Sequence, residues 1–224
     1  MFENATQLAQ LLDHTLVRPD ATITDVAAAC EEAKKYGFHC VVVSGSHVAQ
    51  ARELLSGTLI KVCAVVGFPH GASTTTVKIV EAMEAMKNGA SELDIVINIG
   101  MMRSGRFDYV EIDLKNVIAM TSQKVHKIIL ETGSLTQDEI TRACEIAVRA
   151  GAEFVKTSTG YGPRGATVED VRLLRQAVGQ RCRIKASGGI RDLATVSALV
   201  EAGAERIGTS AGPAIMEEYL RSKK

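Results

Sequence analysis

The sequence predicts an α/β fold, a (β/α)8 barrel, on three observations. Eight short runs rich in valine and isoleucine are spread along the 224 residues, helical patterns lie between them, and one helix–turn–strand pattern recurs. Most runs are apolar almost throughout, as in parallel strands that are covered on both faces. A doubly wound open sheet is the second interpretation, but no glycine-rich turn follows the first run, where that fold normally has one. The expected strands are 14–17, 39–44, 61–68, 92–99, 126–131, 154–159, 183–187 and 206–210.

Between these runs, apolar residues recur at the spacing of an amphipathic helix. Thr136 and Glu139 have the spacing of a capping box, which marks a helix start. A short helix is expected at the N-terminus, and residues 1–224 are expected to form a single barrel domain. The stripes that fit one apolar helix face are Val77, Val80, Met83 and Met86; Ile140, Cys144 and Ala147; Val168, Val171, Leu174 and Val178; and Leu193, Val196 and Val200.

The recurring pattern is a helix end, a glycine and then a strand. It occurs at 88–94, 150–156 and 202–208, with a looser copy at 36–42. A glycine there can take the left-handed conformation that ends a helix, and a short loop then leads into the strand. The residues five positions after each glycine should therefore occupy comparable places on different strands. They are Val42, Asp94, Lys156 and Gly208.

The composition is close to that of an average soluble globular protein. Apolar residues make up 46% and charged residues 23%, and 26 basic residues balance 26 acidic ones. With no basic excess and only 4% aromatic residues, nucleic-acid binding is not expected. The start does not read as a signal peptide, and the most apolar run, 62–68, is too short to span a bilayer. We expect a cytoplasmic protein without a membrane partner, whose five cysteines, which include no C-x-x-C pair, stay reduced.

Asp94, Lys156 and Lys185 interrupt strands that are otherwise apolar or small. A single strand lysine usually pairs with a surface carboxylate or lies at a solvated edge, but a closed barrel has no edge strand. Lys156 and Lys185 lie on consecutive expected strands. Neighbouring parallel strands are about 4.8 Å apart, so two lysines that point inward would be close neighbours. Burial and a neighbouring positive charge lower the pKa of an amine, and a neutral amine can attack a carbonyl to form a Schiff base. Asp94 would then donate or accept a proton, or form a plain salt bridge to one lysine.

Glycine and hydroxyl residues cluster directly after the last strands, at 157–160, 186–189 and 209–212. Glycines let backbone N–H groups approach an anion closely, and barrels often bind a substrate phosphate at the loops after strands seven and eight. The sequence therefore predicts a phosphate site there. The five histidines show neither H-x-H nor H-E-x-x-H spacing, which disfavours a metal-dependent mechanism. We expect no metal ion and no cofactor.

In these residues the chain resembles the deoxyribose-phosphate aldolases, a family of class I aldolases. The resemblance spans the whole chain, and its most specific segments are K-T-S-T-G at 156–160 and K-A-S-G-G at 185–189. It implies the reversible cleavage of 2-deoxy-D-ribose 5-phosphate to D-glyceraldehyde 3-phosphate and acetaldehyde. It also implies Lys156 as the Schiff-base lysine, Lys185 as the lysine that perturbs its pKa, and Asp94 as the carboxylate that works with a water in proton relay. The implied substrate and phosphate contacts are Thr15, Gly160, Gly188, Gly189, Gly208 and Ser210.

The second strand departs from the family pattern, which usually reads V-C-V-N-P with its cysteine near the substrate. Val42 replaces that cysteine, and residues 44–45 read Ser-Gly in place of Asn-Pro. Cys40 lies two residues earlier and does not inherit the role. The family's chemistry does not use this thiol as a nucleophile, so activity is still expected. His70 and Arg164 are given no role.

Two other functions stay open from the sequence. One is another Schiff-base barrel, such as a transaldolase-like enzyme acting on longer phosphosugars. The other is a barrel that binds a phosphosugar without turnover. A small phosphosugar is the expected partner in each case. Barrels of this type are often dimers or tetramers, which predicts a homo-oligomer by analogy alone.

Overall fold

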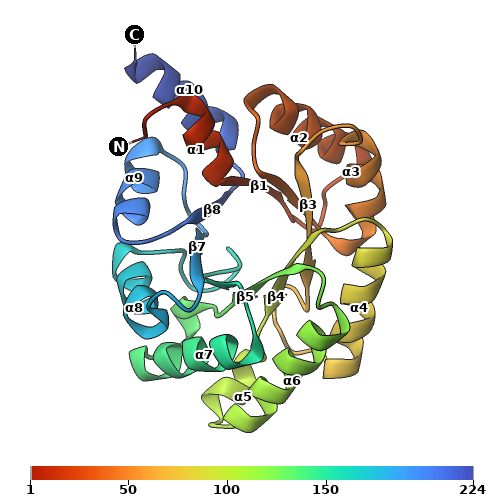
Figure 1. The fold of residues 1–224 in the computed structure, drawn as a ribbon, viewed down its shortest axis with the longest axis vertical. Coiled ribbons are helices and arrows are strands. Elements are labelled where there is room, and N and C mark those ends of the chain that lie inside the picture. The colour runs from red at the N-terminus through yellow and green to blue at the C-terminus, as the bar shows by residue number, and fades with distance from the viewer. Residues whose placement is uncertain (1, 224) are drawn as a thin grey trace.

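A computed structural model describes residues 2–223, and in it eight parallel strands close into a barrel (Figure 1). Each strand pairs with the next in sequence, and the last pairs with the first, which confirms the predicted (β/α)8 barrel. The predicted strand 154–159 stops at Lys156, and the residues after it form a loop. The strands are β1 (Leu12–Leu16), β2 (Cys40–Val43), β3 (Lys61–Val66), β4 (Glu92–Val96), β5 (Val125–Ile129), β6 (Phe154–Lys156), β7 (Arg183–Ser187) and β8 (Arg206–Thr209).

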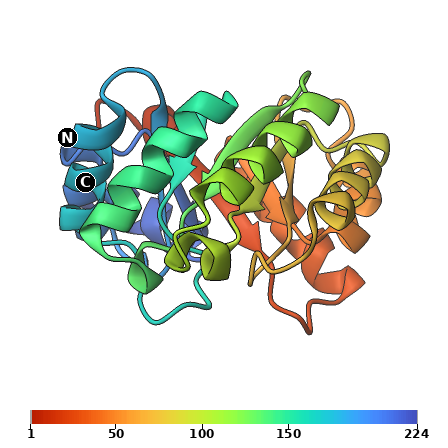
Figure 2. The same ribbon diagram turned by 90° about the horizontal axis from the view of Figure 1, so that it is seen from below.

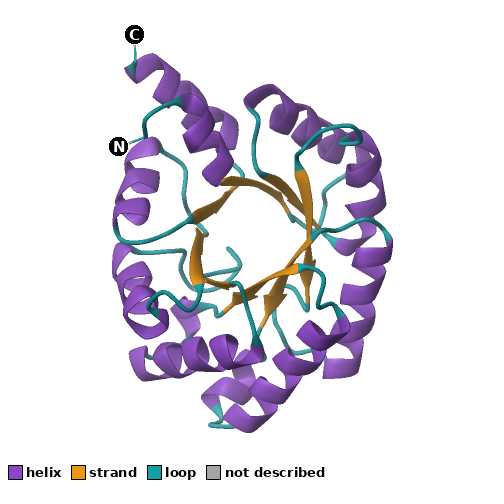
Figure 3. Ribbon diagram, viewed as in Figure 1, coloured by secondary structure: helices purple, strands orange, loops and turns teal. Residues whose placement is uncertain are grey.

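Helices surround the strands on the outside, as Figure 3 shows end-on and Figure 2 shows from below. They are α1 (Ala5–Leu11), α2 (Ile23–Tyr36), α3 (Val48–Leu54), α4 (Thr75–Lys87), α5 (Ile99–Arg103), α6 (Phe107–Met120), α7 (Gln137–Ala150), α8 (Val168–Val178), α9 (Leu193–Glu201) and α10 (Gly212–Ser222), with two short 3-10 helices, η1 (Gly45–His47) and η2 (Thr132–Ser134). The expected N-terminal helix is α1, which packs against α10. Within residues 2–223, no helix is both long and apolar enough to cross a membrane.

Local sequence signals set both ends of α7. The side chain of Thr136 accepts a hydrogen bond from the Glu139 N–H, and the Glu139 carboxylate accepts one from the Thr136 N–H. The predicted capping box is therefore present, and it satisfies two N–H groups that the helix leaves open. The helix ends at Gly151, whose φ of 91° is left-handed and is reached most easily by glycine.

The predicted apolar faces are right for α7 and α8 and wrong for α4. In α7 and α8 the predicted stripes pack on the core. In α4, Val77, Val80 and Met83 are exposed. Small alanines let α4 pack closely on the barrel, and Lys78 can be buried with them because its Nζ lies 2.6 Å from the carboxylate of Asp113 in α6. The buried residues of α4 are Lys78, Ala82 and Ala85.

The inside of the barrel explains the spacing of the sequence repeat. In such barrels, alternate strands contribute side chains to the same interior layer. The positions five residues after the repeated glycines fall on β2, β4, β6 and β8, which are alternate strands. A small apolar cluster fills one side of this interior, next to the charged side chains described below. It consists of Cys40, Val42, Cys63 and Val65, with Val17 and Phe68 packed against it.

Candidate active site

Asp94 lies among three lysines inside the barrel. Its carboxylate oxygens are 2.6 Å from Nζ of Lys156, 2.8 Å from Nζ of Lys185 and 2.9 Å from Nζ of Lys127. These residues come from four consecutive strands, β4 to β7, and the strand register pairs Lys156 directly with Lys185. The structure thus brings together the three polar strand residues that the sequence singles out, and it adds Lys127, which the sequence analysis missed.

A second set of charged side chains continues the network toward the N-terminal ends of the strands. Asp13 lies 2.5 Å from Nζ of Lys185 and 3.0 Å from Nη1 of Arg206. Glu92 lies 2.6 Å from Nζ of Lys127. Glu92 and Arg206 are the first residues of β4 and β8, so that the ion pairs run along the barrel axis. Sequence reasoning missed all three of Asp13, Glu92 and Arg206.

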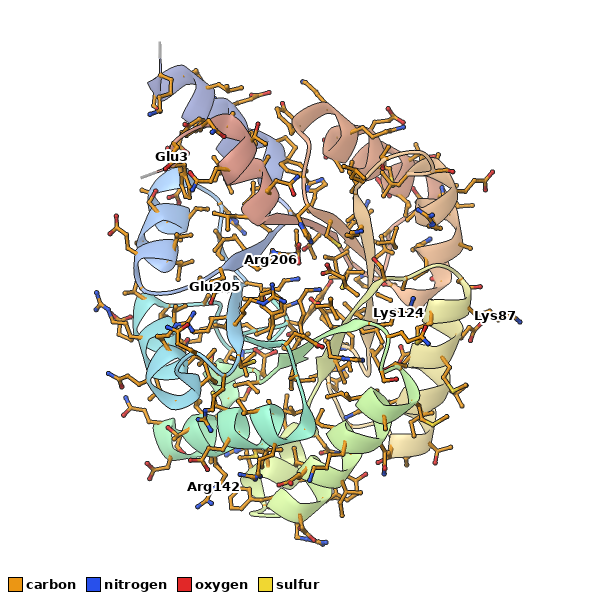
Figure 4. All side chains as sticks on the ribbon, viewed as in Figure 1. Glu3, Lys87, Lys124, Arg142, Glu205 and Arg206 are labelled. Carbon is orange, nitrogen blue, oxygen red and sulfur yellow. The ribbon has the colours of Figure 1, made fainter. Side chains whose placement is uncertain are left out.

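We refer to these residues as the interior charge cluster. Figure 4 shows Arg206 near the middle of the molecule, whereas Lys87 lies at its edge. An unbalanced charge in a buried interior is costly, and arginine stays protonated in proteins. The cluster is therefore balanced when one of its lysines is neutral. Its members are three carboxylates, Asp13, Glu92 and Asp94, and four basic groups, Lys127, Lys156, Lys185 and Arg206.

Lys156 is the lysine of the cluster that loses its proton most readily. Burial lowers its pKa, and although Asp94 opposes this effect, the positive charge of Lys185 reinforces it. Burial alone would also lower the pKa of Lys185. There, however, the carboxylates of Asp13 and Asp94 outweigh it and hold the pKa above its ordinary value. Lys185 thus lies close to two carboxylates, those of Asp13 and Asp94. Lys156 lies close to Asp94 alone and shares that carboxylate with the other two lysines.

Asp94 stays ionised in this setting. Burial alone would raise its pKa, but the charges of Lys127, Lys156 and Lys185 hold the pKa well below its usual value. A carboxylate this acidic passes a proton on to a neighbouring base instead of keeping it. Cys63 also contacts Asp94: its Sγ donates to Oδ1 of Asp94 at 3.1 Å and accepts from Nζ of Lys127 at 3.4 Å.

A cavity of about 300 Å³ opens at the C-terminal ends of the strands. Among the described residues, Lys156 is the one member of the interior charge cluster that lines it, and 3% of its surface is exposed. Asp94 and Lys185 lie behind Lys156 and are fully buried. Six residues for which the sequence implies substrate contacts also line this cavity: Thr15, Gly160, Gly188, Gly189, Gly208 and Ser210.

The turns after β7 and β8 form the polar side of the cavity. Gly188 and Gly189 have φ angles of 91° and 76°, which other residues rarely adopt. A Cβ on Gly189 would meet no atom within 4 Å, so the turn leaves open space beside its backbone. Arg18 and Arg191 line the same cavity and supply positive charge that the sequence analysis did not assign to the site. This combination suits an anion.

The opposite side of the cavity is apolar and is formed by Val17, Val65 and Phe68. Val42, which stands where the family pattern has a cysteine, is buried beside Val65. Among residues 2–223, no thiol lines the cavity, and all five cysteines are free and buried.

Arg164 and His70, the two residues without an assigned role, lie outside the cavity lining. Arg164 forms an ion pair with Asp170, and His70 is exposed.

One group of side chains has the chemistry of metal ligands within residues 2–223. Asp13, Cys40 and Glu92 have ligand atoms within 4.8 Å of one another. Lys185 and Lys127 already lie 2.5 Å from Asp13 and 2.6 Å from Glu92, respectively. Ammonium groups therefore already supply the positive charge that a cation would bring to these carboxylates.

Known proteins match the chain over nearly its whole length. Residues 7–218 match the sequence model of the DeoC/LacD family aldolases. A deoxyribose-phosphate aldolase of Methanothermobacter thermautotrophicus is 54% identical over 218 residues, which cover 97% of this chain and 97% of that protein. One of Caldanaerobacter subterraneus subsp. tengcongensis is 50% identical over 222 residues, covering 98% and 96%. Among solved structures, a tetrameric deoxyribose phosphate aldolase from Aeropyrum pernix has a TM-score of 0.92 at 32% identity, covering 98% of this chain and 93% of that one.

Proposed function

Because the chain belongs to the DeoC/LacD family of aldolases, we propose that the cavity at Lys156 is its active site and that Lys156 forms the Schiff base. The protein is an aldolase, a carbon–carbon lyase. It reversibly cleaves 2-deoxy-D-ribose 5-phosphate to D-glyceraldehyde 3-phosphate and acetaldehyde through a lysine Schiff base. The observation that carries the assignment to Lys156 is that this lysine, with its lowered pKa, is the member of the interior charge cluster that reaches the cavity.

The reaction begins with attack of the neutral Lys156 amine on the C1 carbonyl of the open-chain sugar. Loss of water gives an imine, and with a proton on its nitrogen this group is positively charged and withdraws electrons from the C2–C3 bond. A base then takes the proton of the C3 hydroxyl, the C2–C3 bond breaks, and glyceraldehyde 3-phosphate leaves. The two remaining carbons stay on Lys156 as an enamine. Protonation at C2 and addition of water release acetaldehyde and restore the amine.

Asp94 supplies the proton transfers in this scheme, and Lys185 sets the charge around it. Asp94 lies 2.6 Å from Nζ of Lys156, within reach of protons that enter or leave that nitrogen. Lys185 lies 2.8 Å from Asp94 and keeps its own proton, so that its charge holds Asp94 ionised and lowers the pKa of Lys156. The phosphate of the substrate lies at the turns after β7 and β8, where Gly188, Gly189 and Ser210 line the cavity.

Trapping with borohydride tests this assignment. Incubation with acetaldehyde and borohydride should add one ethyl group irreversibly, and peptide mapping should find it on Lys156. Lys156→Ala should remove both the adduct and the release of aldehyde from deoxyribose 5-phosphate. An adduct on Lys185, or turnover by the alanine variant, would overturn the role given to Lys156.

Substrate comparison separates the remaining alternatives. We expect aldehyde release from deoxyribose 5-phosphate and little from fructose phosphates, which a transaldolase-like enzyme would favour. A barrel that only binds phosphosugars would show neither turnover nor an adduct. Faster turnover of fructose phosphates than of deoxyribose 5-phosphate would contradict the substrate assignment but not the assignment of the Schiff base.

The chain is further proposed to form a homo-oligomer. The exposed face of α4 that carries Val77, Val80 and Met83 is the candidate contact, because clustered exposed apolar side chains often mark protein interfaces. The relative from Aeropyrum pernix, at 32% identity, is tetrameric. Light scattering after size exclusion should give a dimer or tetramer, and Val80→Glu should shift it toward smaller species. A monomeric wild type would overturn this proposal, and an unchanged oligomer in the variant would move the interface elsewhere.

A further inference from the structure

Glu131, two residues past the end of β5, has an unusual backbone and an unusual environment. Its φ of 56° and ψ of 61° are left-handed, and it is the one residue other than glycine with a positive φ among residues 2–223. Its side chain is also buried, with 2% of the residue exposed. A glutamate in this conformation persists only where its surroundings hold it, and such residues concentrate at functional sites.

The carboxylate of Glu131 holds the loop that follows Lys156. Oε2 of Glu131 accepts hydrogen bonds from both the N–H, at 3.1 Å, and the hydroxyl of Thr159. Oγ1 of Thr159 in turn accepts one from the N–H of Tyr161 at 3.0 Å. Gly162 packs against the same carboxylate, since a Cβ at Gly162 would lie 2.5 Å from Oε1 of Glu131. Residues 159–162 are therefore shaped around Glu131.

This loop forms one wall of the substrate cavity, to which Thr159, Gly160 and Tyr161 contribute. The hydroxyl of Tyr161 donates to the carbonyl of Val17 at 3.2 Å, and its ring stands edge-on to that of Phe68 with centroids 5.6 Å apart. The loop thus connects β5 to the loops after β1 and β3 across the mouth of the barrel.

The same loop also supports the turn that is proposed to bind phosphate. The hydroxyl of Ser187 donates to the carbonyl of Ser158 at 2.5 Å, and the N–H of Ala166 donates to the carbonyl of Gly188 at 3.1 Å. A Cβ on Gly165 would lie 2.1 Å from that carbonyl oxygen, so the two backbones are in close contact. A shift of the loop would therefore displace both Gly160 and the turn at Gly188.

We propose that Glu131 is a positioning residue for the phosphorylated end of the substrate. It holds Thr159 so that the loop after β6 keeps the phosphate site in its binding shape. The proposal rests on the function proposed above and assigns a role to a residue that does not line the cavity.

The amine of Lys156 does not depend on this link. Its Nζ is held by Asp94, and its carbonyl accepts from the N–H of Leu130 in the strand ladder. Loss of the Glu131 carboxylate should therefore impair binding of the phosphorylated sugar and leave Schiff-base formation with acetaldehyde nearly unchanged.

Two variants test the link from its two sides. Glu131→Gly removes the carboxylate without backbone strain, since glycine adopts a positive φ readily. Gly162→Ala keeps Glu131 but places a methyl group where its carboxylate lies. Both should raise KM for deoxyribose 5-phosphate by about 10- to 100-fold, as expected for losing a charged, buried hydrogen-bond acceptor. In both, the rate of borohydride trapping with acetaldehyde should stay within about twofold, because it uses only the Lys156 amine.

The matched control is Glu139→Gln. Glu139 also accepts a hydrogen bond from a loop N–H after β5, but it caps α7 outside the cavity lining and should leave KM unchanged. An unchanged KM in Glu131→Gly, or equal losses in trapping and in KM, would overturn the proposal, as would failure of both variants to fold. A wild type that is not trapped at Lys156 would instead overturn the function proposed above.

Discussion

Lys156 and Lys185 are both buried, on adjacent strands and in contact with Asp94, yet their pKa values shift in opposite directions. Burial acts on both in the same direction, so the difference comes from the carboxylates around them. Lys185 has Asp13 as a second partner, at 2.5 Å. Lys156, the proposed nucleophile, is thus distinguished from Lys185 by the number of nearby carboxylates, and its pKa depends on the whole interior charge cluster.

Lys185→Leu should move the activity profile to higher pH. Without Lys185, the positive charge that lowers the pKa of Lys156 is gone, while Asp94 still favours its protonated form. Three basic groups then balance the three carboxylates only if Lys156 is protonated. The pKa of Lys156 should therefore rise, so that less of its amine is neutral at pH 7 and kcat/KM there should fall by roughly tenfold. The measurement is kcat/KM between pH 6 and 10.

Lys87→Leu, which removes an exposed lysine of α4, serves as the control and should leave the profile unchanged. Circular dichroism should show the fold retained in both variants. If the profile of Lys185→Leu coincides with that of the wild type, Lys185 does not tune Lys156.

Gly189→Val should raise KM for deoxyribose 5-phosphate strongly. The new side chain would enter open space in the cavity, and at a φ of 76° a β-branched residue also strains the turn. Cleavage of unphosphorylated deoxyribose should change far less, because that substrate has no group for the proposed phosphate site. Steady-state kinetics with the two sugars measure the difference.

Gly151→Val is the matched control for backbone strain. Gly151 has a φ of 91° and an equally open Cβ position, but it ends α7 away from the cavity. It should lower stability without raising KM. Equal losses of both activities in Gly189→Val, with the fold intact, would place the phosphate elsewhere.

The residues that sequence reasoning found and missed differ in how they stand out from their neighbours. Asp94, Lys156 and Lys185 are polar residues inside apolar strands, and this contrast is visible in the sequence. Glu92 and Arg206 begin their strands, where a charged residue is ordinary, so they gave no such contrast. The two-residue period of a strand could have indicated them, because they lie two positions before Asp94 and Gly208, for which the sequence predicts comparable places on their strands.

Lys127 and Asp13 required more than the strand period. Their place follows from the register between strands, which pairs Asp94 with Lys127 and Asp13 with Gly208. The sequence predicts that these strands exist but not how they are offset along the barrel. Glu131 left no signal, because its left-handed backbone arises from tertiary contacts.

Among the helices, those with one clear apolar stripe were predicted best. The outer faces of α7 and α8 are polar, so a single set of positions can face the barrel. Helix α4 carries large apolar residues on one face and alanines with Lys78 on another, and only close packing on the barrel decides between them. Side-chain size in the sequence favoured the larger residues, whereas the structure buries the smaller ones.

Thr136→Ala should destabilise the protein without affecting catalysis. The change removes the hydroxyl that accepts from the Glu139 N–H at the start of α7, at a cost of about 1 kcal/mol. In a chain of this size the midpoint of thermal unfolding should fall by roughly 2–4 °C, with kcat/KM unchanged. Calorimetry and steady-state kinetics measure the two effects.

Thr141→Ala is the comparison within the same helix. The Thr141 hydroxyl bonds to the Gln137 carbonyl within α7, and alanine favours helix formation, so the midpoint should not fall. Equal destabilisation by the two substitutions would mean that the cap contributes nothing specific.

At the scale of the whole molecule, the barrel holds ion pairs where a purely structural core would hold apolar side chains. Buried ion pairs are seldom more stabilising than apolar side chains of similar volume. The chemistry proposed for Lys156 would explain their presence along the barrel axis, because it needs an ionised carboxylate and a neutral amine in contact. The same arrangement makes the stability of the entire fold depend on pH.

Acid should therefore unfold the protein steeply. The pKa values of Asp13, Glu92 and Asp94 all lie below their ordinary values of 3.8 for aspartate and 4.5 for glutamate. The effect of burial is outweighed at Glu92 by the hydrogen bond with His39 and by the charges of Lys127 and Arg206, and at the two aspartates by the surrounding basic side chains. A carboxyl group with a depressed pKa in the folded state stabilises the fold above its unfolded pKa, and this contribution is lost as pH falls toward the folded pKa. His14 adds a smaller loss below its ordinary pKa of 6.5, since burial lowers its pKa and the unfolded chain takes up that proton first.

Urea unfolding between pH 7 and pH 3 measures this dependence. The free energy of unfolding should decline gently from pH 7 to about 5 and then fall below about 4.5 by up to roughly 4 kcal/mol per pH unit, which corresponds to about three protons taken up on unfolding. Asp138→Asn, an exposed change at the start of α7, should keep this slope. Asp13→Asn should make the slope shallower, because one of the three carboxylates no longer titrates and about one proton fewer is taken up on unfolding. A free energy that stays level down to pH 3 would mean that the interior carboxylates keep their ordinary pKa values, and the charge balance that leaves Lys156 neutral would then fail with them.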